Sequence, residues 1–317
     1  MDQLAILDRR RLRRKLTFWR LLALVVIIGL GYALFRLGSD NGGAAIPHVA
    51  HVKITGMIQD DTELLERLEE IAKSPSAKAL VVSITSPGGT TYGGERIFEA
   101  IRAVAEKKPV VSDIRTLAAS AGYMIATAGD TIIAGDSSIT GSIGVIFQYP
   151  QIAELMDKLG ISLEEIKSTP LKAEPSPFHP PSDEAQQMIR AMIMDSYDWF
   201  VDLVAERRNM SRQEALRLAD GSIFTGRQAL QARLVDTLGG SQEIRAYLEG
   251  RGVGADLPMV EWKDSSSSSS IWLGRAMAEF VRISGLGEVI GISTLRTWGG
   301  EKLFLDGLVS VWQVGGE

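Results

Sequence analysis

The chain has 317 residues, a formal net charge of −5 and no cysteine. Its length can hold one large or two modest domains with a sizeable buried core. The negative charge argues against general nucleic-acid binding, and the lack of cysteine excludes disulfides, a thiolate nucleophile and cysteine-ligated metal sites. An apolar content of 45% with 23% charged residues is ordinary for a globular protein.

The N-terminal region has the pattern of a membrane anchor. A basic cluster at residues 9–15 precedes an apolar segment at residues 21–35, which Arg20 and Arg36 bracket. This segment is close to the minimum length for crossing a bilayer, because both arginines can snorkel to the interfaces and Trp19 can lie in one of them.

A retained anchor is favoured over a cleaved signal peptide, since no clear A-x-A site follows the apolar core at the expected distance. We therefore expect a basic cytoplasmic N-terminus at residues 1–17 and one transmembrane helix at residues 18–36. By the positive-inside rule, everything after Arg36 then lies on the outer side of the membrane. Residues 37–50, which are rich in small residues, are expected to form a flexible stalk.

Beyond the stalk, strand and helix patterns alternate, which indicates an α/β fold with a largely parallel sheet flanked by helices. The alternation lies within residues 51–262, which we expect to form the functional domain. Strands are predicted at 51–58, 79–84, 109–114, 131–134 and 161–166. Helices are predicted from Asp60 or Asp61 through Ile71, through Ile97, Ile101 and Val104, and at 124–128, 151–159, 182–208, 212–218 and 227–233.

The C-terminal region begins with a Ser-rich linker at residues 263–270 and continues as a tail at residues 271–317. Apolar residues from Trp272 to Val281 recur at helical spacing in this tail. A small packing or oligomer-contact helix is favoured over a membrane-surface helix, because the polar face is not notably basic.

A stretch of small residues, 117–123, lies between a predicted strand and a predicted helix, and it contains Ser120. A strand, a tight turn and a helix in this order would place the Ser120 hydroxyl at a helix N-terminus. There, backbone N–H groups and the helix dipole stabilise developing negative charge. The stretch alone is a weak signal for a nucleophile, because small residues also pack a helix closely against a sheet.

A second turn, at Gly88 and Gly89, follows the predicted strand at 79–84. Ligands of open parallel sheets bind at the carboxyl ends of the strands, where both this turn and Ser120 are expected. A glycine there can bring a bare backbone N–H close to a substrate carbonyl. A plain strand-to-helix turn is the structural alternative.

Histidine and lysine are both candidates for the general base. His48 and His51 lie at the start of the domain, and His179 lies among prolines, where no supporting acid stands out. A lysine that burial keeps neutral is the alternative. Lys167 and Lys172 flank a predicted junction between strand and loop, but spacing alone selects neither.

In order and spacing, the motifs resemble those of the bacterial signal peptide peptidase SppA family in its short, single-repeat form. The resemblance covers about residues 51–240. It rests on Ser86-Pro-Gly-Gly89, Ala118-Ala-Ser-Ala-Gly-Tyr123, Thr140-Gly-Ser-Ile-Gly-Val145, Lys167-Ser-Thr-Pro-Leu-Lys172, Asp220-Gly-Ser-Ile-Phe-Thr-Gly226 and Leu234-Val-Asp236. It implies a ClpP/crotonase-like α/β fold, here preceded by the one transmembrane helix.

The resemblance also implies a serine endopeptidase with a Ser/Lys dyad. It matches Ser120 to the nucleophile, Lys172 to the general base and Ser142 to the serine that orients the base. The backbone N–H groups of Gly89 and Ala121 would form the oxyanion hole. Neither a metal nor a cofactor is implied.

Three positions need comment. Lys167 matches a family position that is not the base, and we interpret it as structural or substrate-lining. Ala121 stands where the family usually has glycine, but alanine still supplies the N–H. Arg233 stands where a glycine commonly precedes Leu-Val-Asp, which would alter that turn.

The resemblance further implies a homo-oligomer, an octamer whose active sites are shared between subunits. Its substrates would be remnant signal peptides and similar apolar peptides. The expected location is the bacterial inner membrane, with a single pass and the catalytic domain on the periplasmic side. Three alternatives remain open: a hydratase or isomerase of the same fold, a non-catalytic membrane scaffold, and a related protease that cleaves membrane-protein segments. The presence of both Ser120 and Lys172 speaks against the first two.

Overall fold

The structure, a computed structural model, describes residues 46–263 and 309–311, together with Trp19, Leu22, Val26 and Gly29. The chain divides into a unit of residues 1–46 and a unit of residues 47–317. The four described residues of the expected anchor at 18–36 are helical, and the rest of that segment lies outside the described residues. No helix within the described residues has both the length and the apolar character needed to cross a membrane.

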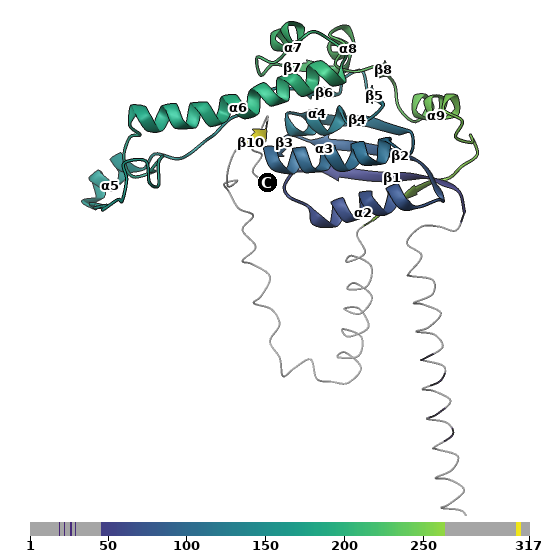
Figure 1. The fold of residues 1–317 in the computed structure, drawn as a ribbon, viewed down its shortest axis with the longest axis horizontal. Helices are drawn as coiled ribbons and strands as arrows, with labels where there is room; N and C mark the ends of the chain where they lie inside the picture. Colours follow the sequence, from purple (N-terminus) through teal and green to yellow (C-terminus); the bar gives the residue numbers. More distant parts are fainter. Residues whose placement is uncertain are drawn as a thin grey trace, which may run out of the picture. The chain divides into compact units, whose positions relative to one another are not determined.

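The second unit is built on an eight-stranded sheet in its described residues (Figure 1). The strand order is β7-β6-β4-β2-β1-β9, with β5 paired to both β4 and β8. All of these pairs are parallel except β6 with β7. The strands are β1 His48–Thr55, β2 Ala77–Ser86, β4 Val110–Ala119, β5 Thr131–Ala134, β6 Ile139–Gly141, β7 Ile223–Thr225, β8 Thr237–Leu238 and β9 Met259–Glu261.

A separate two-stranded antiparallel sheet consists of β3 Gly88–Thr90 and β10 Val309–Val311. The eight-stranded sheet is mixed but mostly parallel, because only β6 and β7 pair antiparallel in it. The alternation of strand and helix patterns predicts such a sheet. The first strand begins at His48, inside the segment expected to be the stalk.

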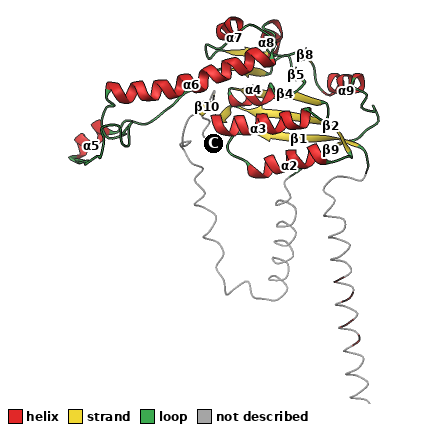
Figure 2. Ribbon diagram, viewed as in Figure 1, coloured by secondary structure: helices red, strands yellow, loops and turns green. Residues whose placement is uncertain are grey.

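Helices connect the strands and cover both faces of the sheet (Figure 2). They are α2 Thr62–Lys73, α3 Thr91–Ala105, α4 Ala121–Ala126, α5 Ala153–Leu159, α6 Asp183–Arg207, α7 Arg212–Leu218, α8 Gly226–Gln231 and α9 Ser241–Gly250. The Asp61 carboxylate accepts a hydrogen bond from the Leu64 N–H at 2.9 Å, so Asp61 rather than Asp60 caps α2. The helix α9 was not expected from the sequence.

The main core lies between the sheet and the helices α2, α3 and α4. Leu68 of α2, Ile101 of α3 and Ile125 of α4 are fully buried there, together with Val82 of β2. A smaller cluster on the other side of the sheet holds Ile244 and Leu248 of α9 against the N-terminal halves of the strands. Helices on both sides leave the carboxyl ends of the central strands for the loops that carry the motifs.

The strand expected at residues 161–166 is wrong, because the structure has irregular backbone there. The side chains of Ile161, Leu163 and Ile166 are exposed rather than buried in a sheet. Apolar β-type residues form a strand only where a neighbouring strand accepts their hydrogen bonds. This segment lies beside α5, on an arm of the chain that projects from the sheet (Figure 1), and there it has no strand to pair with.

Candidate active site

Ser120 occupies a tight turn between β4 and α4, as the sequence predicts. Its backbone has φ 58° and ψ −120°, a conformation that costs a non-glycine residue of order 1–3 kcal/mol. The Ser120 N–H donates to the Gly141 carbonyl at 2.8 Å, and the side chain is almost fully buried. A strained serine between a strand and a helix is the geometry of a nucleophile elbow, in which the turn fixes the direction of the hydroxyl.

Small residues allow α4 to approach the sheet closely. A methyl group added to Gly122 would lie 3.0 Å from the Ser86 carbonyl oxygen, and one added to Gly94 of α3 would lie 3.2 Å from the Ala121 Cβ. Ala121 is the first residue of α4 and has helical geometry, so its position does not require glycine. The substitution of alanine for the family's glycine is therefore compatible with this turn.

Gly89 lies in β3, directly after the carboxyl end of β2. It pairs with Ile58, whose N–H donates to the Gly88 carbonyl at 2.8 Å and whose carbonyl accepts from the Thr90 N–H at 2.9 Å. Because β2 and β4 are neighbours, Gly89 follows the strand next to the one that leads to Ser120. The Gly89 turn and the Ser120 turn therefore lie at the same end of the sheet, where the carboxyl ends of β2 and β4 are, as expected.

Replacing Gly89 with alanine is expected to destabilise the protein by about 2 kcal/mol or more and to reduce activity, because the site cannot accept a methyl group. An added Cβ would lie 1.9 Å from the Ile58 carbonyl oxygen, so the backbone of β3 must move. Gly250→Ala is the matched control, because nothing lies within 4 Å of a Cβ there. Thermal unfolding and peptide hydrolysis of both variants provide the measurement. Equal stability of the two variants would contradict the prediction.

Ser142 follows β6 and lies next to the Ser120 turn. Ala119 of β4 pairs with Gly141 of β6, so Ser120 and Ser142 are the next residues of two neighbouring strands. Ser142 also has a positive φ, 51°, and only 8% of it is exposed. Ser120 and Ser142, both with positive φ, therefore lie side by side just beyond the ends of β4 and β6.

The turn at Asp220–Ser222 holds Ser142 in place, a role that the sequence did not reveal. The Ser142 N–H donates to the Ser222 carbonyl at 2.7 Å, and the Asp220 carboxylate accepts from the Ser222 N–H at 2.9 Å. This turn leads into β7, which pairs with β6. The motif starting at Asp220 carried the signal, but only the antiparallel pairing connects it to Ser142.

Arg233 has φ 60°, a left-handed conformation that favours glycine. This agrees with its position, where the resemblance leads one to expect glycine. The following Leu234 carbonyl accepts a hydrogen bond from the buried Tyr123 hydroxyl at 2.9 Å. This hydrogen bond connects α4 to the turn that Arg233 forms.

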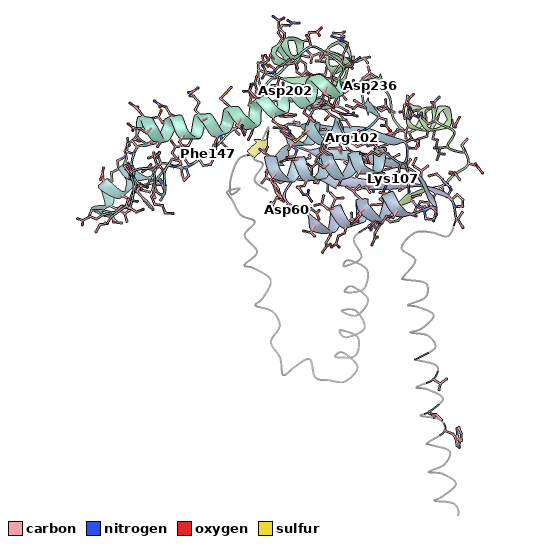
Figure 3. All side chains as sticks on the ribbon, viewed as in Figure 1. Asp60, Arg102, Lys107, Phe147, Asp202 and Asp236 are labelled. Carbon is pink, nitrogen blue, oxygen red and sulfur yellow. The ribbon has the colours of Figure 1, made fainter. Side chains whose placement is uncertain are left out.

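Lys172 lies on a different part of the unit from the other candidates. The arm contains α5 and the loop that leads from it to α6, and it projects away from the body that carries α4 (Figure 1). Phe147 lies where the chain leaves the body for this arm (Figure 3). Lys172 is exposed, and its backbone N–H donates to the Thr169 carbonyl at 3.1 Å. Within one chain, the structure therefore brings Ser120, Ser142, Gly89 and Ala121 together but leaves Lys172 apart.

Lys167 forms ion pairs that link the two sides of the loop that carries Lys172. Its ammonium group lies 2.7 Å from both the Glu165 and the Glu174 carboxylates, and the Glu174 side chain is only 5% exposed. His179 lies on the same side of the loop, with its Nε2 3.4 Å from Glu174. Lys167 is therefore held as a structural cation, and His179 belongs to the arm rather than to the Ser120 turn.

Acid is expected to loosen this arm loop. Hydrogen bonds from Lys167 hold the pKa of Glu165 and of Glu174 below the ordinary value of 4.5. A carboxylate whose pKa is lower in the folded than in the unfolded state stabilises the fold above the unfolded pKa, and this is lost as the pH falls through the folded pKa. We therefore expect the hydrogen-exchange protection factors of this loop to decrease when the pH is lowered below 4.5. The protection factors of β4 should stay unchanged.

Glu174→Gln should produce the same loss of protection at neutral pH, because the amide cannot pair with the ammonium group of Lys167. The pair lies on the arm and not in the core between the sheet and the helices, so the effect should stay local. Unchanged protection of the loop both in acid and in this variant would contradict the assignment.

A second polar row crosses β1, β2 and β4 but does not form a catalytic triad. The Ser83 hydroxyl donates to the Asp113 carboxylate at 2.8 Å, and His51 Nε2 lies 2.8 Å from the same hydroxyl. Since the hydroxyl proton is given to Asp113, His51 must be the donor to Ser83. A triad requires histidine in the middle as the proton acceptor, so this row does not activate Ser83.

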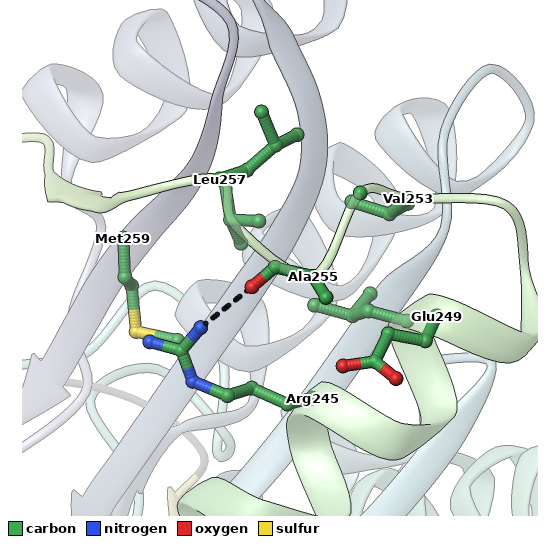
Figure 4. A pocket seen from close by; sticks show the side chains of 9 residues that line it. Arg245, Glu249, Val253, Ala255, Leu257 and Met259 are labelled. Carbon is green, nitrogen blue, oxygen red and sulfur yellow. Dashed lines mark hydrogen bonds between the residues drawn. The ribbon is translucent and has the colours of Figure 1, made fainter.

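The pocket in Figure 4 lies between α9 and the chain that leads to β9. The Arg245 guanidinium donates to the Ala255 carbonyl at 3.1 Å across it. None of the candidate catalytic residues lines this pocket. Among the described residues, no three His, Asp or Glu side chains are grouped so as to bind a metal ion.

Comparison with known proteins assigns the chain to a family of peptidases. The sequence profile of Peptidase family S49 matches residues 102–253, and that of Clp protease matches residues 45–135. A protein of Enterococcus faecium named for a signal peptide peptidase SppA is 32% identical over 253 residues, which are 75% of this chain and 74% of that protein. A protein of Synechocystis sp. named as a protease is 37% identical over 201 residues, which are 63% of this chain and 72% of that protein.

Two further similarities are weaker in coverage or in geometry. Protease 4 of Haemophilus influenzae is 33% identical over 169 residues, which are 53% of this chain and 27% of that protein. A solved structure of a mutant 1510-N membrane-bound stomatin-specific protease covers 68% of this chain and 98% of its own, at 18% identity and a TM-score of 0.47. The matches to the two sequence profiles and to the Enterococcus faecium protein show that the chain belongs to peptidase family S49, the signal peptide peptidase SppA family, and is a serine peptidase with a ClpP-like α/β domain.

Proposed function

We propose that the protein is a membrane-anchored endopeptidase that uses Ser120 and Lys172 as a dyad to degrade remnant signal peptides and similar apolar peptides. The observation that carries this proposal is the strained Ser120 turn, which lies beside Gly89 at the carboxyl ends of two neighbouring strands. In the mechanism, the unprotonated Lys172 amine takes the Ser120 proton while the serine oxygen attacks the peptide carbonyl carbon.

The negative charge then collects on the carbonyl oxygen, where the N–H groups of Gly89 and Ala121 stabilise it. The Lys172 ammonium group returns the proton to the leaving amine as the C–N bond breaks. Water hydrolyses the acyl-enzyme, with Lys172 again as the base. Ser142, which leaves the sheet beside Ser120, orients the lysine in this proposal.

The dyad is proposed to form between copies. The arm that carries Lys172 projects away from the body that carries Ser120, so a neighbouring copy supplies the lysine (Figure 1). Exposed apolar side chains on the arm support burial against another copy; they are Leu155, Leu159, Ile161, Leu163 and Ile166. We propose a closed ring, because such heterologous contacts either close into rings or extend without limit. The number of eight copies is taken from the resemblance to the SppA family.

The remaining parts are assigned in the same proposal. Residues 18–36 anchor the protein in the inner membrane, and residues 48–262, which begin with β1, form the protease domain on the periplasmic side. Residues 37–47 form the stalk, residues 263–270 the linker and residues 271–317 the C-terminal tail. An anchored site next to the bilayer suits signal peptides, which are apolar and are released there.

The test is hydrolysis of quenched fluorescent peptides by the full-length protein in detergent micelles. One peptide is a cleaved signal peptide, and the other is a transmembrane segment of equal length and net charge. A higher kcat/KM for the signal peptide supports the proposal, and a higher value for the other supports the related protease that cleaves membrane-protein segments. Lack of Ser120-dependent hydrolysis of either peptide in an assembled protein would support the non-catalytic scaffold.

A further inference from the structure

A hydrogen bond from the long helix α6 reaches the turn on which Ser142 rests. The Tyr197 hydroxyl donates to the Ala219 carbonyl at 2.8 Å. Ala219 is the C-terminal cap of α7, where carbonyl groups have no partner within the helix and need a donor from elsewhere. The supporting turn, as we call residues 219–222, continues from this carbonyl to Ser222. A side chain of α6 is therefore attached to the start of the turn.

Tyr197 is a firm point of attachment. Its ring is partly buried against the main core, and it lies one helical turn before Phe200, which is fully buried there. The Arg212 guanidinium at the start of α7 lies 2.6 Å from the Asp198 carboxylate and 2.7 Å from that of Asp202 (Figure 3). This half of α6 and the helix α7 therefore lie side by side.

The supporting turn itself has little packing. Asp220, Gly221 and Ser222 are exposed, and nothing lies within 4 Å of a Cβ added to Gly221. Gly221 has φ 84°, and glycine adopts such a backbone conformation as readily as others. Hydrogen bonds at the two ends therefore decide where the turn lies. Tyr197 holds the end at Ala219, and the pairing of β7 with β6 holds the other end.

The supporting turn fixes the backbone of Ser142. The Ser142 N–H donates to the Ser222 carbonyl at 2.7 Å. Ser142 has φ 51°, and a residue other than glycine keeps such a conformation only where its surroundings hold it. If the turn moves, Ser142 can relax. The Ser120 turn is held separately, because its N–H donates to the Gly141 carbonyl within the paired end of β6.

We infer that Tyr197 is a positioning residue that holds Ser142 in its active orientation through the supporting turn. This inference rests on the proposed function, in which Ser142 orients Lys172. Tyr197 acts through Ser142, so it affects the alignment of the base and not the binding of the peptide. A displacement of about 1 Å in a group that aligns reactants can lower the rate about a hundredfold.

The first experiment measures hydrolysis of the quenched signal peptide by full-length protein in detergent micelles. Tyr197→Phe keeps the ring and its packing and removes only the hydroxyl. We expect kcat to fall about tenfold or more at constant KM. Tyr247→Phe is the matched control, because Tyr247 of α9 is also partly buried but packs against the smaller cluster on the other side of the sheet. It should keep the kcat of the parent.

A double variant tests whether Tyr197 acts through Ser142. Ser142→Ala alone should lower kcat, and adding Tyr197→Phe should lower it no further, because the side chain that the hydroxyl positions is already absent. Two independent structural defects would instead multiply their effects. Sedimentation velocity and thermal unfolding check that each variant is assembled and folded.

The second experiment measures the same link without catalysis. Hydrogen exchange is followed in Ser120→Ala protein with and without Tyr197→Phe. Protection of the Ser142 amide should fall about fivefold when the hydroxyl is removed, which is the size expected for the loss of one hydrogen bond. Protection of the amides of β1 should not change.

The outcomes separate this inference from the proposed function. Ser120-dependent hydrolysis with the same kcat in Tyr197→Phe as in the parent overturns the inference and leaves the proposed function intact. An equal loss of kcat in Tyr247→Phe, or effects that multiply in the double variant, shows a general structural role and also overturns the inference. Lower protection of the Ser142 amide in a protein that hydrolyses no peptide supports the hold of Tyr197 on Ser142 and overturns the proposed function.

Discussion

Ser120→Ala is expected to reduce peptide hydrolysis at least about 10³-fold, because in the proposed mechanism the acyl-enzyme forms on the Ser120 hydroxyl. The surrounding sheet holds the backbone of this proposed nucleophile in a strained conformation, and alanine keeps that backbone. Folding and assembly should therefore be preserved. The measurement is kcat/KM on a quenched peptide, together with thermal unfolding.

Two matched variants make the result specific. Ser137→Ala removes an exposed serine after β5 and should retain full activity. Ser120→Gly should be as inactive as Ser120→Ala but more stable than it by about 1 kcal/mol, because glycine adopts φ 58° without strain. Residual activity of Ser120→Ala above a hundredth of the parent would assign the nucleophile elsewhere.

Lys172→Met is expected to cause a loss of similar size, because Ser120 then has no base to accept its proton. Lys172→Arg should be equally inactive, since a guanidinium stays protonated at all working pH values. Lys158→Met is the matched control, because Lys158 is exposed on α5 of the same arm. Loss of activity in the control as well would indicate a general defect of the arm instead.

The position of Lys172 predicts complementation between two inactive variants. When Ser120→Ala and Lys172→Met subunits are unfolded together and reassembled in equal amounts, about a quarter of the shared sites should combine an intact serine with an intact lysine. Activity should then rise to about a quarter of the parent. If each chain built its own site, the mixture would stay inactive, and the assignment of a shared site would be wrong.

Local sequence patterns predicted most of the helices and strands, because helix and strand preferences depend on residues that are close together in the chain. The apolar run at 79–84 became β2, and the Ser120 stretch became a strand, turn and helix. The strand at 161–166 failed for a physical reason: β-type residues there resemble those of β5, but only β5 has neighbours to pair with. Burial against a neighbour, which a local pattern does not contain, decided between the two.

The sequence by itself determined the family motifs, the serine and glycine turns at the strand ends, and the presence of lysines near residue 170. Tertiary structure decided what these residues can reach. It placed Ser142 beside Ser120 through parallel pairing, separated Lys172 on an arm, and paired β10 with β3. These relations depend on contacts between segments far apart in the chain, and their energies come from hydrogen bonds and packing that form only once the sheet is assembled.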